Sequence, residues 1–117
     1  MHEEESKIKF ELIITIVERH MSADVIDASR RGGAEGGTIL KGRGSGIHER
    51  MKLLGLTIEP EKEIVLTLVD STIRNQVVKE IAKEIDIDKP GHGILFVLDV
   101  SKVAGIPHLK MFSNDNE

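Results

Sequence analysis

Two segments of the chain alternate side chains between two faces, as β-strands do. Residues 10–17 read FELIITIV and residues 64–69 read IVLTLV, and both are rich in β-branched side chains. One face of the first strand carries its even-numbered positions, Phe10, Leu12, Ile14 and Ile16. The run IITIV also matches VLTLV at a constant offset of 52 residues, which indicates a doubled unit.

Each of these strands is followed by a helical pattern and then by another strand. Asp70 and Ser71 are suited to cap a helix. The apolar positions of that helix recur every four residues, at Ile73, Val77, Ile81 and Ile85. Ser22 is suited to cap a shorter first helix, and further strands are predicted at residues 38–41 and 94–100.

Two βαβ units in one chain of 117 residues predict the α+β, ferredoxin-like arrangement. This is a four-stranded antiparallel sheet with both helices on one face and, here, a long loop between the second and third strands. We expect a single domain over residues 1–117, with frayed tails at residues 1–6 and 110–117.

The second face of the sheet is also expected to be apolar. On the side away from the helices we place the odd-numbered apolar residues, Ile13, Val17, Val65, Val69, Leu95 and Val97. A sheet-sized apolar patch is unusual on a monomer, so other subunits are predicted to bury it. The alternative is that β-branched residues are there only because they favour strands.

Residues 42–60, between the second and third strands, are much longer than the usual connection of about 2–6 residues, and such loops are often functional. Gly42, Gly44 and Gly46 permit positive φ and close approach of a ligand, and Arg43 suits a phosphate or carboxylate. A flexible hairpin tip is the alternative. The apolar loop residues predict contact with a neighbouring subunit or a partner, unless they extend the strands as a hairpin arm: Met51, Leu53, Leu54, Leu56 and Ile58.

A second glycine turn, Gly91-His92-Gly93, precedes the last strand. A tight turn after Pro90 explains these residues by itself. A phosphate-binding role requires this turn to meet the first glycine loop across a cleft or subunit boundary.

Composition and charge exclude several classes of function. The chain has three Phe and no Trp or Tyr, so it lacks a base-stacking platform, and its net charge of −4 argues against a nucleic-acid partner. No apolar run approaches a membrane span, and the acidic start is unlike a signal peptide, so we expect a cytoplasmic protein without membrane insertion. The absence of Cys excludes thiol chemistry.

Neither a metal site nor catalysis is predicted. The histidines do not have metal-ligand spacing: His2, His20, His48, His92 and His108. Ser45 lies between glycines without the strand-to-helix turn of a nucleophile elbow. Glu59, Glu61 and Glu63 alternate ahead of the third strand, which fits a solvated strand edge better than an acid–base pair. A small enzyme is therefore the least favoured class.

Over residues 8–104 the chain resembles the PII nitrogen-regulatory signalling family. The resemblance rests on the doubled order of elements, on Lys41-Gly42-Arg43-Gly44, and on the segment from Gly91 to Val103, which is similar to the family's G-D-G-K-I-F-V-F-D-V-A-R-V. It implies a trimer that binds ATP or ADP between subunits, with 2-oxoglutarate joining the ATP–magnesium complex. The long T-loop would dock on a transporter, an enzyme or a regulator.

The resemblance implies two sets of site residues. The nucleotide set is Gly42, Arg43, Gly44, Gly91, His92, Gly93 and Lys102. The partner-binding set in the loop is Ser45, His48, Arg50, Met51, Leu53 and Leu54.

Several family positions differ in this chain. There is no Tyr for uridylylation, Ser45-Gly46 stands in place of the family's Gln, and Ile94 replaces its Lys after the glycines. Gly105 and Pro107 occupy the positions of two Arg. These changes remove charge-assisted contacts and argue against 2-oxoglutarate with magnesium. The sequence predicts no required cofactor and an ATP, ADP or AMP type of effector; the alternative is a docking or assembly module of the same fold without an effector.

Overall fold

The structure is a computed structural model that describes residues 9–45 and 51–105, with the backbone alone at residues 51–53 and 56–58. The tails predicted at residues 1–6 and 110–117 lie outside the described residues. Neither of the two described helices is long and apolar enough to cross a membrane.

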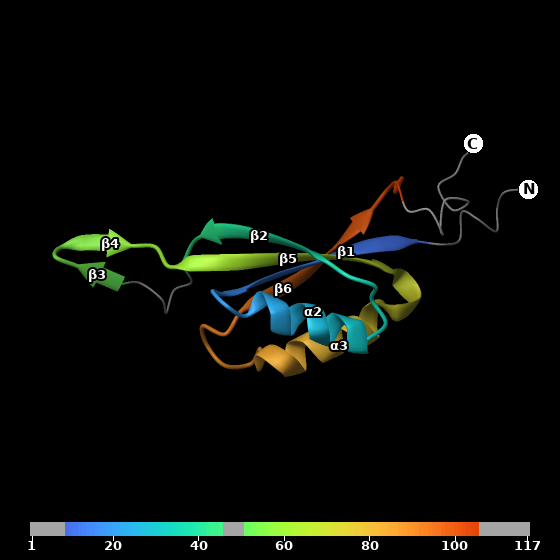
Figure 1. The fold of residues 1–117 in the computed structure, drawn as a ribbon, viewed down its shortest axis with the longest axis horizontal. Helices are drawn as coiled ribbons and strands as arrows, with labels where there is room; N and C mark the ends of the chain where they lie inside the picture. Colours follow the sequence, from blue (N-terminus) through green and yellow to red (C-terminus); the bar gives the residue numbers. More distant parts are fainter. Residues whose placement is uncertain (1–8, 46–50, 106–117) are drawn as a thin grey trace, which may run out of the picture.

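Six strands and two helices make up the described fold (Figure 1). In chain order they are β1 (Phe10–Glu18), α2 (Ser22–Arg31), β2 (Thr38–Arg43), β3 (Met51–Leu53), β4 (Leu56–Ile58), β5 (Glu61–Asp70), α3 (Ser71–Ile85) and β6 (Ile94–Val100). The main sheet has the order β2-β5-β1-β6, and all its neighbouring strands are antiparallel. Both helices lie on one face of it (Figure 1). The predicted ferredoxin-like α+β fold is confirmed.

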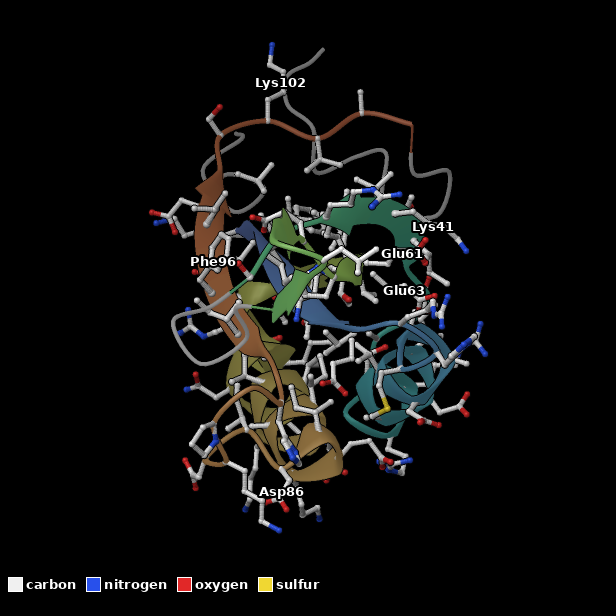
Figure 2. The ribbon with its side chains drawn as sticks, turned by 90° about the vertical axis from the view of Figure 1, so that its left-hand side faces the viewer. Lys41, Glu61, Glu63, Asp86, Phe96 and Lys102 are labelled. Atoms are coloured by element: carbon white, nitrogen blue, oxygen red, sulfur yellow. The ribbon has the colours of Figure 1, made fainter. Side chains whose placement is uncertain are left out.

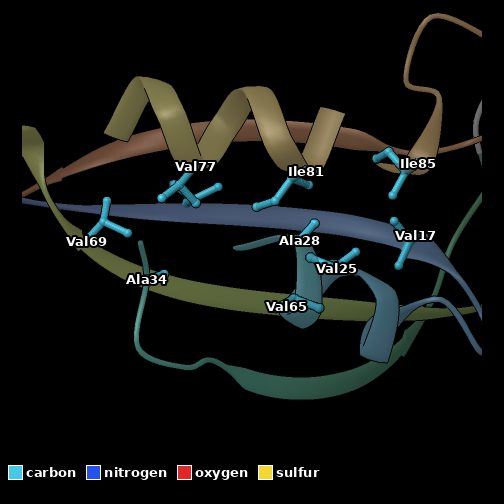
Figure 3. Packing of buried hydrophobic residues seen from close by; sticks show 10 residues of the cluster. Val17, Val25, Ala28, Ala34, Val65, Val69, Val77, Ile81 and Ile85 are labelled. Carbon is cyan, nitrogen blue, oxygen red and sulfur yellow. The ribbon is translucent and has the colours of Figure 1, made fainter. Parts of the chain in front are cut away.

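The odd-numbered residues of the central strands face the helices. Ile13, Val17, Val65 and Val69 are buried in one cluster with helix residues (Figure 3). The helices contribute Val25, Ala28, Val77, Ile81 and Ile85 to that cluster, and Leu95 and Val97 of β6 pack against it. The prediction that the odd-numbered set points away from the helices is therefore wrong. Both sets are apolar, and a period of two separates the faces without saying which one the helices cover.

The opposite side of the sheet, called the open face from here on, is nevertheless apolar. It carries the even-numbered residues, Leu12, Ile14 and Ile16 of β1, Leu40 of β2, Ile64, Leu66 and Leu68 of β5, and Ile94, Phe96 and Leu98 of β6. Leu40, Ile94, Phe96 and Leu98 are exposed in the single chain, and the others are half-buried. An apolar patch of this extent is unusual on a monomer, so we expect another protein surface to cover it.

The two helices begin in different ways. The Asp70 carboxylate accepts a hydrogen bond from the Thr72 N–H at 2.8 Å, so the predicted cap of α3 is confirmed. In α2 the N-cap is Met21, which offers no side-chain bond, and Ser22 is already helical. The predicted Ser22 cap is wrong, because Glu63 of β5 takes that place and accepts from the Ser22 N–H at 3.0 Å.

Between β2 and β5 the chain forms a separate hairpin, β3–β4, beyond the end of the main sheet (Figure 1). Leu54 and Gly55 join its strands with φ values of +54° and +81°, as the two central residues of a type I′ turn require. At the loop base the Gly44 N–H donates to the Pro60 carbonyl at 3.1 Å. The expected hairpin arm exists, but it is a two-stranded sheet of its own and not a continuation of β2 and β5.

Candidate functional site

The two glycine segments lie at one end of the main sheet. Strand register places Arg43, which ends β2, opposite Glu61, which begins β5, and places Ile94, which begins β6, opposite Ile16 near the end of β1. β2 and β6 are the outer strands, so β5 and β1 lie between the two segments. Adjacent strands are spaced by about 4.8 Å, which separates the segments by roughly 14 Å. Within one chain they face a shared end of the sheet but do not meet.

Lys102 lies at the other end of the sheet. It follows Val100, whose register partner on β1 is Phe10, the first residue of that strand. Figure 2 shows Lys102 well apart from Lys41. One chain therefore does not bring Lys102 together with either glycine segment.

The glycines of the two segments have different structural roles. Gly42 continues β2, and a Cβ there would lie 3.1 Å from the Ile64 Cδ1 on the open face. A Cβ on Gly44 would meet nothing within 4 Å, and neither residue has the positive φ that the sequence suggested. Gly91 and Gly93 do have positive φ, +81° and +153°, and a Cβ on Gly93 would lie 3.0 Å from the Ile16 carbonyl oxygen. The geometry of the turn is therefore sufficient to explain why residues 91 and 93 are glycines.

His92 is exposed, but its ring is held against the end of α3. Its Nδ1 lies 3.0 Å from the Ile85 carbonyl oxygen. Because a carbonyl only accepts, Nδ1 is the donor, and Nε2 is the ring nitrogen left for a ligand.

A pocket of about 320 Å³ lies at the β2 side of the same sheet end. Its charged lining consists of Arg19, Lys41, Arg43, Glu61, Lys62 and Glu63, together with the backbone of Gly42. Lys41 pairs in register with Glu63, and Arg43 with Glu61, on the helix side of the sheet. Arg19, which follows β1, lies 3.3 Å from Glu61 (Nη1 to Oε1). Figure 2 shows Lys41, Glu61 and Glu63 together on one side of the molecule.

Glu63 is buried, and its environment favours the charged form. Hydrogen bonds from the Ser22 side chain and the Ser22 backbone N–H hold the pKa of Glu63 below its usual value, although burial alone would raise it. The nearby charge of Lys41 acts in the same direction as the hydrogen bonds. The prediction of a solvated strand edge is thus wrong for Glu63, while Glu61 and Glu59 are exposed as expected.

The partner-binding residues are only partly described. The Ser45 hydroxyl donates to Glu59 Oε1 at 3.0 Å across the loop base. Leu54, at the tip of the hairpin, is 94% exposed. Met51 and Leu53 lie in β3, where only the backbone is described, and His48 and Arg50 lie outside the described residues.

Of the positions where the sequence departs from the PII pattern, Ile94 lies on the open face with 55% of its surface exposed. Gly105 has a φ of +94°, whereas Gly46 and Pro107 lie outside the described residues. Among the residues that the structure describes, no three His, Cys, Asp or Glu side chains gather where they could hold a metal ion.

A family comparison agrees with this fold. The family model described as "Nitrogen regulatory protein P-II" matches residues 10–108. The chain belongs to the P-II family. No curated protein matches it by sequence.

Solved structures of P-II proteins share this architecture. The PII protein of Arabidopsis thaliana bound to citrate is 24% identical, with a TM-score of 0.67 over 85% of this chain and 84% of that one. The GlnK–ATP complex of Bacillus subtilis is 16% identical, with a TM-score of 0.62 over 80% of this chain and 83% of that one. At 24% and 16% identity, the likeness shows only that these proteins and this chain share a fold.

Sequence reasoning missed most of the charged pocket. Arg19 was not singled out, and Glu61 and Glu63 were interpreted as solvated. A signal was present, since Glu61 and Glu63 continue the alternation of Val65 and Val69 and so share the helix side of β5. A strand that begins at Glu61, three residues before the predicted start, has both carboxylates beside β2.

Proposed function

We propose that this P-II chain is a regulatory protein that assembles as a homotrimer and binds a small effector, of the adenine-nucleotide type, between neighbouring copies. It acts on a partner protein through residues 43–60. The observation that carries the proposal is the position of the two glycine segments, at one end of the sheet but on opposite outer strands. A ligand that contacts both Gly42–Gly44 and Gly91–Gly93 needs a second copy, which brings one outer strand beside the other.

The open face supports the assembly. Its apolar residues lie on all four strands and would be covered if the sheets of neighbouring copies pack against one another. Packing of copies would also let Lys102 of one chain approach the glycine segments of another, which the distance within a single chain prevents.

The names of the relatives support two parts of the proposal: that the effector is a small anion, and that the protein is a regulator. The solved relatives carry ATP or citrate, both small anions. The family description is that of a nitrogen regulatory protein, so we place this chain with regulators and not with enzymes. The partner is a transporter, enzyme or regulator, and Leu54 at the exposed tip of the hairpin is the side chain best placed to contact it. The cytoplasmic location stays a prediction.

Thermal unfolding with ATP, ADP and AMP, each with and without magnesium and 2-oxoglutarate, tests the effector. A nucleotide at 100 times its dissociation constant stabilises the folded protein by about 2.7 kcal/mol. In Gly44→Val the shift should disappear while the fold is kept, because a side chain there meets open space in the chain but blocks approach to the backbone. Gly36→Ala, also in open space, is the matched control.

The same titration can overturn the proposal. If no nucleotide shifts the unfolding temperature, the chain is a docking or assembly module of this fold without a nucleotide effector. If Gly44→Val responds as the parent does, the first glycine segment does not contact the ligand.

A further inference from the structure

The second glycine segment, Gly91-His92-Gly93, carries a side chain of the type that changes its charge near neutral pH. The His92 ring is exposed, and its Nδ1 donates to the Ile85 carbonyl oxygen at the end of α3, 3.0 Å away. The backbone N–H of His92 donates to the Lys89 carbonyl oxygen at 3.2 Å. Backbone and ring are both fixed in this way, and Nε2 is the ring nitrogen left to meet a ligand.

The other charges of the turn do not suit a phosphate. Lys89 lies 3.0 Å from Asp86 (Nζ to Oδ2), and Asp88 is an exposed carboxylate. Ile94, which follows the glycines, is apolar. Two carboxylates and one ammonium group give residues 86–93 a net charge of −1 while His92 is neutral, and a proton on His92 brings this charge to zero.

The elements packed against the turn are α3, through Ile85, and the end of β1, beside Gly93. Their titratable and charged side chains next to the turn are Lys83, Glu84, Glu18, Arg19 and His20. Of the two permanent cations among these, Lys83 lies 3.9 Å from Glu80. Arg19 lies 3.3 Å from Glu61. Both are in ion pairs, so a proton on His92 is the change that adds unpaired positive charge on this side of the site.

We propose that effector binding is coupled to protonation of His92. The coupling rests on the nucleotide site proposed above and adds the regulation of that site. In the protonated ring both nitrogens donate: Nδ1 keeps its bond to the Ile85 carbonyl oxygen, and Nε2 donates to a phosphate oxygen. The end of α3 also favours the cation, because the carbonyl groups there carry partial negative charge. Histidine changes its charge between about pH 5 and pH 8, so the nucleotide binds more tightly as pH falls through that range.

A simpler explanation is that His92 only closes the end of α3 by bonding one of its last carbonyl groups. The two explanations differ in what the proton changes. If His92 only closes the helix, pH acts through His92 on the free energy of unfolding and leaves nucleotide affinity alone. If the ring contacts the phosphate, pH acts through His92 on nucleotide affinity itself.

Calorimetric titration of the intact chain with ATP, ADP and AMP at about pH 6 and pH 8 tests the coupling. From pH 8 to pH 6 the affinity of the parent should rise about fivefold more than that of His92→Asn. The Asn amide can still donate to the Ile85 carbonyl oxygen but has no ring nitrogen to protonate. The nucleotide's own phosphates titrate equally in both experiments, so their effect cancels in this comparison.

His20→Asn is the matched control. His20 is also an exposed histidine, its φ of +78° lies in a region that Asn tolerates, and it belongs to neither glycine segment. Its replacement should leave the pH dependence of nucleotide binding as in the parent. Circular dichroism of each variant checks that the fold is kept, and urea denaturation without nucleotide measures the effect on stability alone.

Each outcome decides the inference. If a nucleotide binds and His92→Asn keeps the pH dependence of the parent, the coupling is wrong while the nucleotide site stands. The same holds if His20→Asn loses as much of the pH dependence as His92→Asn does, or if His92→Asn alters only the denaturation curves. If none of the three nucleotides binds at either pH, the proposed effector class fails and the coupling falls with it.

Discussion

Two buried hydroxyl groups stand out at the scale of single residues. Thr15 and Thr67 occupy equivalent positions of the sequence repeat and are fully buried on the helix side of β1 and β5. Neither Oγ1 has a hydrogen-bond partner among the described residues. A buried polar group without a partner costs stability, so these hydroxyls oppose folding where a methyl group would support it.

Replacing either residue by valine should therefore stabilise the protein. We expect Thr15→Val and Thr67→Val each to raise the free energy of unfolding by about 1 kcal/mol, as measured by urea denaturation. Thr38→Val, at an exposed position of β2, should change it by less than about 0.5 kcal/mol. A loss of stability in both buried variants would mean that the hydroxyls have partners outside the described residues.

Glu63 gives the protein an acid-sensitive contact. Its folded-state pKa is lowered, so the stability that its charge contributes is present above its unfolded pKa of about 4.3 and is lost as pH falls through the folded value. Glu63→Gln should lower the free energy of unfolding by about 1 kcal/mol at pH 7. The difference from the parent should shrink as pH falls below the unfolded pKa and vanish once the carboxyl of the folded parent is protonated.

Denaturation series at several pH values measure this, with Asp27→Asn as the control, since Asp27 is an exposed carboxylate of α2, the helix whose first N–H Glu63 accepts. A difference between Glu63→Gln and the parent that persists unchanged in acid would assign the effect to packing instead of charge.

The two helix starts show which residue roles could be predicted from the sequence. Asp70 accepts a hydrogen bond from the N–H of Thr72, only two residues further along the chain. Its capping role can therefore be predicted from the local sequence. Glu63 caps a helix 41 residues away from it in the chain. That contact depends on how β5 lies beside the start of α2, which no local pattern records.

At the scale of elements, the two helices meet through a glycine. A Cβ on Gly32, which ends α2, would lie 2.6 Å from the Cα of Val77 in α3, a distance that side chains do not tolerate against backbone. Farther along the same helix pair, Arg31 contacts Glu80 and Glu84 at 3.3 and 2.8 Å. The close approach at Gly32 thus fixes how α2 packs on α3.

Gly32→Ala should force the helices apart and lower the free energy of unfolding by about 2–3 kcal/mol. Thermal denaturation compared with Gly36→Ala, where the added methyl meets nothing within 4 Å, isolates the steric effect from the general effect of replacing glycine. Equal unfolding temperatures for the two variants would show that the helices can separate at little cost.

The elements themselves were predicted well, because alternation and four-residue spacing are local signals. β1, α3 and β6 lie within one or two residues of their predicted ranges. β5 begins three residues before the prediction, because Glu61 and Glu63, which the sequence analysis interprets as a solvated strand edge, belong to the strand itself. The assignment of the two sheet faces failed for another reason: β1 and β5 are apolar on both sides, and the helices select one side through packing.

At the scale of the whole molecule, the candidate site was predicted only as separate pieces. Glycines and basic residues were visible in the sequence, but their distribution over two edges and two ends of the sheet follows from strand order and register. The charged pocket is likewise formed by residues 19, 41–43 and 61–63, which are adjacent only after β2 and β1 flank β5.

Because both sheet faces are apolar, the proposed trimer can be tested with variants that separate assembly from folding. Leu66 lies on the open face and is half-buried in the single chain, whereas its neighbour Val65 is fully buried against the helices. A charge at Leu66 would be left unpaired only in an interface between copies, and a charge at Val65 would be left unpaired in the core of each chain.

We therefore expect the parent to sediment as a trimer and Leu66→Asp to sediment as a folded monomer near 13.0 kDa. Val65→Asp should lose its helical circular dichroism at every protein concentration. Ile14→Asp on β1, opposite Leu66 in register, should behave as Leu66→Asp does. If Leu66→Asp and Ile14→Asp sediment like the parent, the open face is not the surface that holds the copies together, and a ligand site between them would have to be built from the outer strands alone.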